Sequence, residues 1–213
     1  MGGELTFKKN VKRNIKTTNI TLRISTIVLF ILIAAFSRLI PHPANFAPIG
    51  AMALFGAAYF SQRYLVFIIP VLSMWLSDLV INNVVYGQYF DRFVWFYDGF
   101  YWTYGSFIII GLVGLILLKK VNLKRLIASS LVASVLFFII SNFGVWASGT
   151  FYPKNIAGLI SCYAAGIPFF KNTLMGDFVY CAVMFGAFEF AQYKIPQLRL
   201  NKVFNEKKEG GLS

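Results

Sequence analysis

Hydrophobic stretches alternate with short polar ones along most of the chain. Six apolar runs occupy residues 24–40, 47–60, 64–81, 101–118, 126–146 and 173–193. A helix rises about 1.5 Å per residue and a membrane core is about 30 Å thick, so every run except the second is long enough to cross it. The pattern predicts an all-α fold: a polytopic membrane helix bundle of six transmembrane helices at 24–193, between a basic tail at 1–23 and a flexible tail at 194–213.

The second run decides the topology. Its 14 residues reach only about 21 Å, so it either begins below the outer surface or re-enters on the same side. If it crosses, sixteen of the twenty Lys and Arg residues share the side of both termini; if it re-enters, the split becomes nine against eleven. Because basic residues gather on the cytoplasmic side of membrane proteins, six crossings with both termini cytoplasmic are favoured.

Composition supports an integral membrane protein. With 58% apolar and 13% charged residues and a mean hydropathy of +0.67, the chain has too little polar surface for a water-soluble globule. The net charge of +12 fits orientation and contact with anionic membrane lipid. We expect no nucleic-acid partner, because no basic patch alternates with stacking aromatic residues. Cys162 and Cys181 match neither a metal pair nor a disulfide framework, and we expect no metal and no cofactor.

Unusual polar side chains gather at the outer ends of the expected helices. They are Arg38, His42 and Asn45 in the first outer loop, Trp75, Asp78 and Asn82 at the end of the third run, Asn142 and Trp146 at the end of the fifth, and Asn172 and Asp177 at the beginning of the sixth. Their spacing places Trp75, Asp78 and Asn82 on one helix face. We expect these ten residues to bind a small-molecule ligand in a pocket that opens outward.

Two of these residues are carboxylates inside apolar runs. A carboxylate in the membrane core costs at least about 2.5 to 3.5 kcal/mol, so Asp78 and Asp177 are expected to face the interior of the bundle. There they either contact a ligand or form an internal ion pair with Arg38. The aromatic residues of 93–104 either cover the pocket or form an interfacial belt.

The run RLIPHPANFAPIGAMALFGAAYF at 38–60, followed by SDLVINN at 77–83, resembles the S component, the substrate-capturing subunit, of energy-coupling-factor vitamin transporters. More narrowly, the chain resembles a group of small bacterial membrane proteins with a PHPxNFxPI signature, which also share stretches like SNFGVWASGTFYP and AGIPFFKNTLMGDFVY. The resemblance implies a bacterial inner-membrane protein that captures a vitamin or a precursor, cobalamin-type ligands included, from the outer face.

The same resemblance implies a partner. In that family an ATPase module with a transmembrane coupling subunit drives release of the ligand. Family members often dock on this module through an AxxxA patch in the first span, but the corresponding stretch here reads RISTIVLFIL. Coupling to a shared module and transport by the chain alone therefore both stay open.

Two other classes of function compete. One is a scaffold or accessory subunit of a membrane complex, which would have no enclosed cavity. The other is an intramembrane enzyme in which Asp78 and Asp177 share a proton, although Met175-Gly176-Asp177 differs from the GxGD of aspartyl intramembrane proteases. Hydrolase and nucleotide-binding motifs are missing, so we expect no enzymatic activity. The small residues of 50–58 serve either internal packing or docking of a partner.

Overall fold

A computed structural model describes residues 2–199, with side chains from Thr17 onward. This part of the chain is helical and contains no strand, which confirms the all-α prediction. The helices are α1 (Gly2–Phe36), α2 (Ile49–Tyr59), α3 (Leu65–Val80), α4 (Phe100–Leu117), α5 (Leu123–Ser148) and α6 (Ile156–Lys194), joined by the short turns η1 (Ser37–Leu39), η2 (Ile81–Val85), η3 (Gly87–Tyr89) and η4 (Pro196–Leu198).

Five stretches of the described chain are long and apolar enough to cross a membrane. They are Thr17–Leu39, Leu65–Val85, Phe100–Leu117, Leu123–Ser148 and Ile156–Lys194. The remaining apolar helix, α2, has 11 residues and a length of about 16 Å, well short of a bilayer core. The fold is therefore that of a multi-pass membrane protein with one half-length helix.

The short helix α2 occupies the centre of the bundle. It contacts each of the other five α-helices, and nearly every residue on it is buried, as expected of a helix that is apolar on all sides. A Cβ placed on Gly114 of α4 would lie 2.7 Å from the Cβ of Ala57, so the two backbones approach closely. The small residues of α2 therefore serve internal packing.

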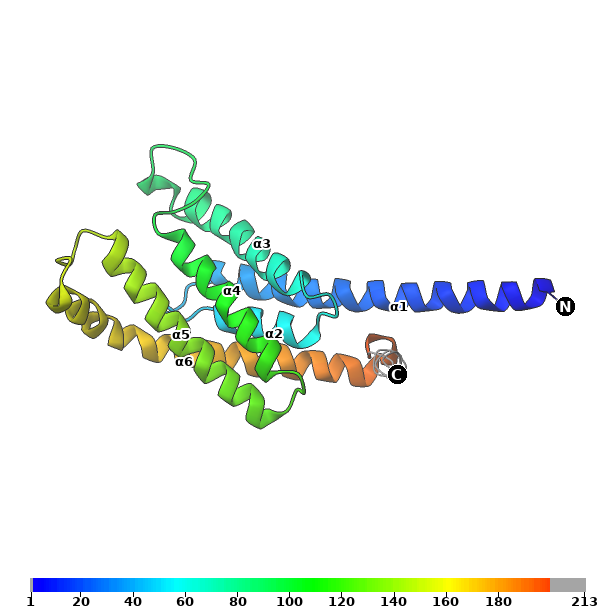
Figure 1. Cartoon of the computed structure of the whole chain (residues 1–213). Helices are drawn as coiled ribbons and strands as arrows, with labels where there is room; N and C mark the ends of the chain where they lie inside the picture. The colour runs from blue at the N-terminus through cyan, green and yellow to red at the C-terminus, as the bar shows by residue number, and fades with distance from the viewer. Residues whose placement is uncertain (1, 200–213) are drawn as a thin grey trace.

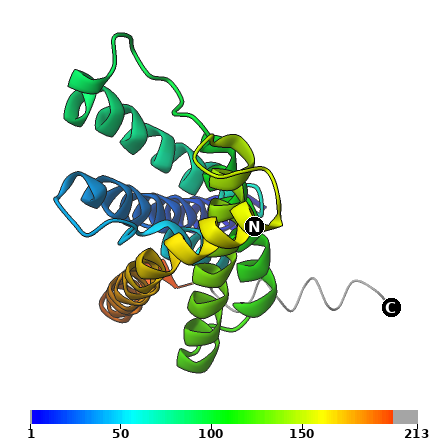
Figure 2. The ribbon, with the colours of Figure 1, turned by 90° about the vertical axis from the view of Figure 1, so that its left-hand side faces the viewer.

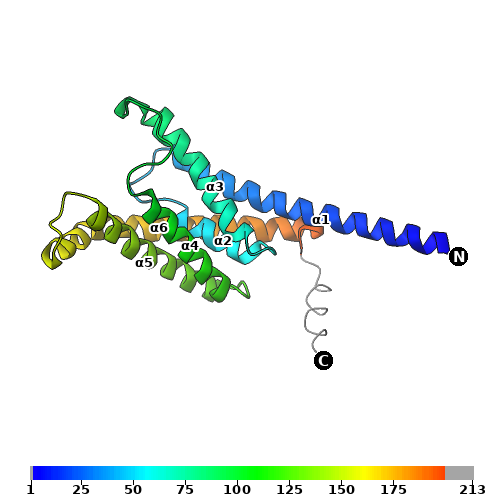
Figure 3. The same ribbon diagram turned by 45° about the horizontal axis from the view of Figure 1, so that its top comes forward.

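The loops separate into two groups at opposite ends of the bundle. The segments at 37–48, 81–99 and 149–155 lie toward one end, and the turns at 60–64 and 118–122 toward the other (Figures 1 and 3). In the view along the bundle, α3, α1 and α6 form one row and α4 and α5 a second (Figure 2). The beginning of α1 and the end of α6 lie on the same side (Figure 1).

The last helix differs most from the sequence prediction. α6 begins at Ile156 and has 39 residues, about 58 Å of helix. The connection between the fifth and sixth predicted runs, at 147–172, is therefore shorter than predicted and covers 149–155. Asn155 starts the helix by accepting a hydrogen bond from the Gly158 amide at 2.9 Å, a typical N-cap. Pro168 lies inside the helix without ending it, and this proline with Lys171 concealed the first half of α6 in the apolar pattern.

Candidate ligand-binding cavity

A cavity of about 220 Å³ lies where the loop after α1 meets the beginning of α2. Four of the residues predicted to bind a ligand line it: Arg38, His42, Asn45 and Asp177. They come from two regions of the chain more than 130 residues apart, the loop at 38–45 and the middle of α6. The structure therefore brings the two ends of the predicted site together.

Arg38 is held on the cavity wall by an ion pair. Its Nη1 atom lies 2.7 Å from Oδ1 of Asp78 and donates to Oγ of Ser77 at 2.8 Å. The other carboxylate oxygen, Oδ2, accepts a hydrogen bond from the Tyr104 hydroxyl at 2.7 Å. Asp78 does not line the cavity. Asp78 therefore orients Arg38 through the internal ion pair that the sequence analysis gave as the alternative to ligand contact. A buried carboxylate that accepts hydrogen bonds from two donors is well satisfied.

Asp177 forms part of the cavity floor and is 1% exposed. Ser134 of α5 donates a hydrogen bond to its Oδ2 atom at 2.6 Å. The carboxylate also lies against the first turn of α2, where a Cβ placed on Gly50 would stand 2.6 Å from Oδ1. Only glycine admits this approach, and the positive end of a helix stabilises a nearby anion. Asp177 thus anchors the beginning of α2 from another helix.

The loop that carries His42 and Asn45 is fixed from α6. Asn172 donates a hydrogen bond to the Ala44 carbonyl at 2.9 Å, so Asn172 positions the loop and does not itself line the cavity. Asn45 has a φ of 63°, a left-handed conformation that asparagine tolerates better than most residues. Because both His42 and Asn45 are exposed, they are accessible from the open side of the cavity.

The remaining predicted residues support the outer loops. Trp75 stacks on Trp95 with ring centroids 6.4 Å apart and donates to the Trp95 carbonyl at 3.2 Å. Asn83, which was not among the predicted residues, fastens the aromatic loop, because its Oδ1 accepts a hydrogen bond from the Val94 amide at 2.7 Å. Asn82 lies in the π-helical turn η2, outside the cavity lining.

Asn142 packs α5 against the first half of α6, and Trp146 joins α5 to the loop before α6. Asn142 donates to the Phe138 carbonyl at 2.8 Å and packs so closely on Gly166 that a Cβ there would lie 2.3 Å from its Oδ1 atom. Trp146 donates to the Pro153 carbonyl at 2.9 Å, and its ring lies under the Lys154 ammonium at 5.6 Å. Neither residue lines the cavity.

Tyr97 belongs to the aromatic residues of 93–104 that were expected either to cover the pocket or to form a belt, whereas Thr103 and Ser134 escaped the sequence analysis. Tyr97 and Thr103 complete the wall, and burial raises the pKa of the Tyr97 hydroxyl to about 12, so this group stays neutral. Ser134 and Gly50 hold Asp177 in place. The one available signal was the pair Ser130 and Ser134, two hydroxyls four residues apart within an apolar run and therefore on one helix face.

A second polar cluster closes the opposite end of α2. Arg23, the last residue of the expected basic tail, lies within α1 and is buried. Its guanidinium donates to the Tyr59 carbonyl at 3.2 Å, to Gln192 Oε1 at 3.0 Å and to the Leu198 carbonyl. The Tyr59 hydroxyl in turn donates to Glu189 at 2.6 Å. This cluster ties α1, α2 and α6 together.

The described residues contain no group of three or more His, Cys, Asp or Glu side chains placed to hold a metal ion. Cys162 and Cys181 are buried free thiols.

Of the comparisons with known proteins, the one with family models gives a match. No curated protein and no solved structure matches the chain significantly. A family model described as "Family of unknown function (DUF6580)" matches residues 18–198, which include every residue named above for the cavity and for the cluster around Arg23. The chain therefore belongs to this family.

Proposed function

We propose that the protein binds a small molecule from the outer face of a bacterial inner membrane, in the manner of an S component, and takes part in its uptake. The observation that carries the proposal is the convergence of Arg38, His42, Asn45 and Asp177 on one cavity. A recess with a few convergent polar groups among apolar walls is the usual form of a small-molecule site.

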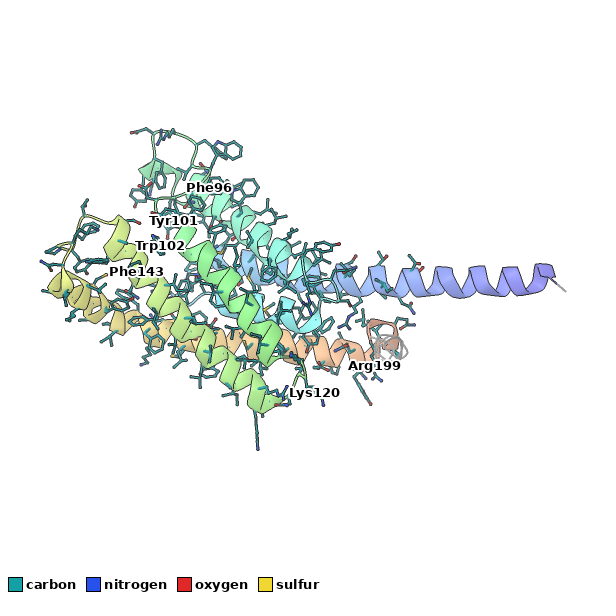
Figure 4. The ribbon with its side chains drawn as sticks, viewed as in Figure 1. Phe96, Tyr101, Trp102, Lys120, Phe143 and Arg199 are labelled. Carbon is teal, nitrogen blue, oxygen red and sulfur yellow. The ribbon has the colours of Figure 1, made fainter. Side chains whose placement is uncertain are left out.

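The charge distribution supports the orientation. If α2 and its flanking loop together cross the membrane, sixteen basic residues lie on the side of both termini and four lie opposite. This distribution agrees with the positive-inside rule. Figure 4 shows Phe96, Tyr101, Trp102 and Phe143 near the end where α4 begins and α5 finishes, and Lys120 and Arg199 at the other end. The cavity then lies on the side away from the cytoplasm.

The size and charge of the cavity favour a small ligand. A volume of about 220 Å³ is below the roughly 300 to 1,000 Å³ of drug-sized sites, and it favours a molecule much smaller than a cobalamin. Because Arg38 is neutralised by Asp78, the Asp177 carboxylate leaves the walls with an excess of negative charge. We therefore expect a small polar vitamin or precursor that donates hydrogen bonds.

The alternatives receive less support. A scaffold subunit does not account for polar groups that line a recess open to one side, although the recess is not enclosed. For an intramembrane aspartyl enzyme the two carboxylates would need common partners, but Asp78 is bound by Arg38 and Tyr104 and Asp177 by Ser134. Neither arrangement favours a shared proton.

The test is ligand binding by the purified full-length protein. Thermal denaturation in detergent, measured with a panel of water-soluble vitamins and precursors, should show a raised Tm with at least one compound, because a ligand stabilises the state that binds it. The shift should disappear in Arg38→Gln and His42→Ala and persist in Lys154→Gln, a residue at the same end outside the cavity. A panel without any shift, together with unchanged vitamin uptake in a deletion strain, would contradict the proposal.

Energy coupling needs a separate experiment. Co-purification in mild detergent should recover an ATPase module if the chain acts as a subunit, whereas reconstituted vesicles containing this protein alone should accumulate the ligand if it acts by itself.

A further inference from the structure

Asp177 has no cationic side chain as a partner in the described part of the chain. Among the described residues Arg38 pairs with Asp78, and the hydrogen-bond partner of Asp177 is the neutral hydroxyl of Ser134. The amides of Gly50 and Ala51 at the beginning of α2 add a favourable partial charge. Buried carboxylates in membrane proteins are usually paired or functional, and this carboxylate has no pairing cation.

One oxygen of this carboxylate is also unsatisfied. Oδ1 of Asp177 is buried and forms no hydrogen bond of ordinary geometry, although the α2 amides lie close to it. The Oγ atom of Ser130, one turn along α5 from Ser134, is also buried without a hydrogen bond of ordinary geometry. It lies beside the thiol of Cys181. Unsatisfied buried oxygens of this kind require an explanation, and a bound ion or proton is one.

Both neutral and ionisable groups surround Asp177. α2 and α5 contribute Gly50 and Ser134, which do not ionise, and α4 contributes Thr103. The ionisable groups nearby are Arg38 and His42 from the loop after α1, Tyr97 from the loop before α4, Asp78 and Tyr104 on the far side of Arg38, and Tyr180 and Cys181 on α6. Asp177 is therefore the acidic group that the cavity reaches.

We propose that Asp177 binds a single monovalent cation, a proton or Na⁺, which enters from the outer side through the cavity. Either cation would neutralise the excess charge and satisfy Oδ1, and carboxylate and hydroxyl oxygens suit both. Asp177 belongs to no group of three or more His, Cys, Asp or Glu side chains in the described chain, and a single carboxylate provides little charge for a divalent ion.

Cation binding at Asp177 would act on α2. The ionised carboxylate anchors the positive end of this helix, and neutralisation weakens that attraction. Since α2 contacts every other α-helix, the occupancy of Asp177 is linked to the packing of the whole bundle. The cation would then accompany the ligand and energise its movement. This coupling rests on the proposed function, whereas cation binding itself does not.

The experiment uses the purified full-length protein without ligand, in two arms. In the sodium arm, choline chloride is replaced by NaCl at constant ionic strength, and Na⁺ binding should raise Tm by at least about 2 °C. In the proton arm, infrared spectra recorded across a pH series should contain a protonated carboxyl band that disappears as pH rises. Whichever response the wild-type protein gives, the sodium shift or the carboxyl band, should be lost in Asp177→Asn. It should be retained in Asp91→Asn, a control at an exposed loop position.

Ser134→Ala protects the test against misfolding of Asp177→Asn. In the proton arm, loss of a hydrogen bond to the ionised carboxylate should move the midpoint of the carboxyl band upward by about one pH unit. In the sodium arm, loss of the hydroxyl oxygen as a ligand should weaken Na⁺ binding. If folded wild-type protein shows neither a sodium shift nor a carboxyl band assigned to Asp177, the residue is permanently ionised and the inference is wrong. Vitamin binding in the same preparation reports separately on the proposed function.

Discussion

The two ends of α2 meet charges of opposite sign but differ in what surrounds those charges. At its beginning, Asp177 lies against the first turn and faces an open cavity. At its end, Arg23 binds the Tyr59 carbonyl within a closed cluster. Both charges suit the helix dipole, an anion at the N-terminus and a cation at the C-terminus. A central helix of 11 residues is therefore anchored at both ends by other helices.

The packing around each charge explains the difference. Near Arg23 large rings fill the space: Phe188 lies 5.5 Å below the guanidinium, and Phe55 and Phe188 meet edge to face at 5.4 Å. Around Asp177 the neighbours are glycine, serine and a polar loop. Aromatic packing leaves no room for a ligand, so the described structure is closed at one end of α2 and accessible at the other.

Breaking the closed end should have the largest effect. Arg23→Met removes a buried cation and leaves the Tyr59 and Leu198 carbonyls and Gln192 without their donor. The expected loss of stability is on the order of 3 kcal/mol, measured by thermal denaturation in detergent. Arg63→Met, at an exposed position, is the control. Equal melting of the two variants would show that the cluster around Arg23 contributes little.

At the open end, Gly50→Ala should have the next largest effect. The added Cβ would stand 2.6 Å from the Asp177 carboxylate, which must then move away from Ser134. We expect a loss of about 1 to 2 kcal/mol. The matched control is Gly105→Ala, where a Cβ has nothing within 4 Å and the better helix propensity should be neutral or stabilising. An unchanged Tm for Gly50→Ala would argue against the tight anchoring of α2.

A smaller effect is expected from Tyr59→Phe. This variant keeps the ring that packs on Phe188 at 4.5 Å and removes the hydroxyl that donates to Glu189. The free energy of unfolding should fall by about 1 kcal/mol. A double-mutant cycle with Tyr59→Phe, Glu189→Gln and the two substitutions combined isolates this hydrogen bond. A coupling energy near zero would show that the hydrogen bond does not contribute to stability.

The smallest effect on stability is expected at the cavity wall. His42 is exposed, so His42→Ala should change the free energy of unfolding by less than about 0.5 kcal/mol. The same variant should nevertheless abolish the Tm shift caused by the ligand. A large loss of stability would instead indicate that His42 is a structural residue of the loop.

The apolar pattern predicted much of the fold because it is a local property. The beginnings of α3 and α4 lie within one residue of the predicted runs at 64–81 and 101–118. The prediction for α6 was wrong at its beginning, because Pro168 and Lys171 interrupt the apolar run while Asn155 caps the helix far upstream. The energetic cost of a carboxylate in the membrane core likewise predicted that Asp78 and Asp177 would face the interior of the bundle, and both are buried.

The sequence by itself determined a helical membrane protein whose costly polar groups had to be buried or gathered near one end of the helices. Only the tertiary structure decided that Arg38 pairs with Asp78 and not with Asp177, that Asn83 holds the aromatic loop, and that Arg23 of the expected tail is buried. The physical reason is that hydropathy acts on each residue locally, whereas the choice of a partner depends on distances between helices that the packing of α2 sets.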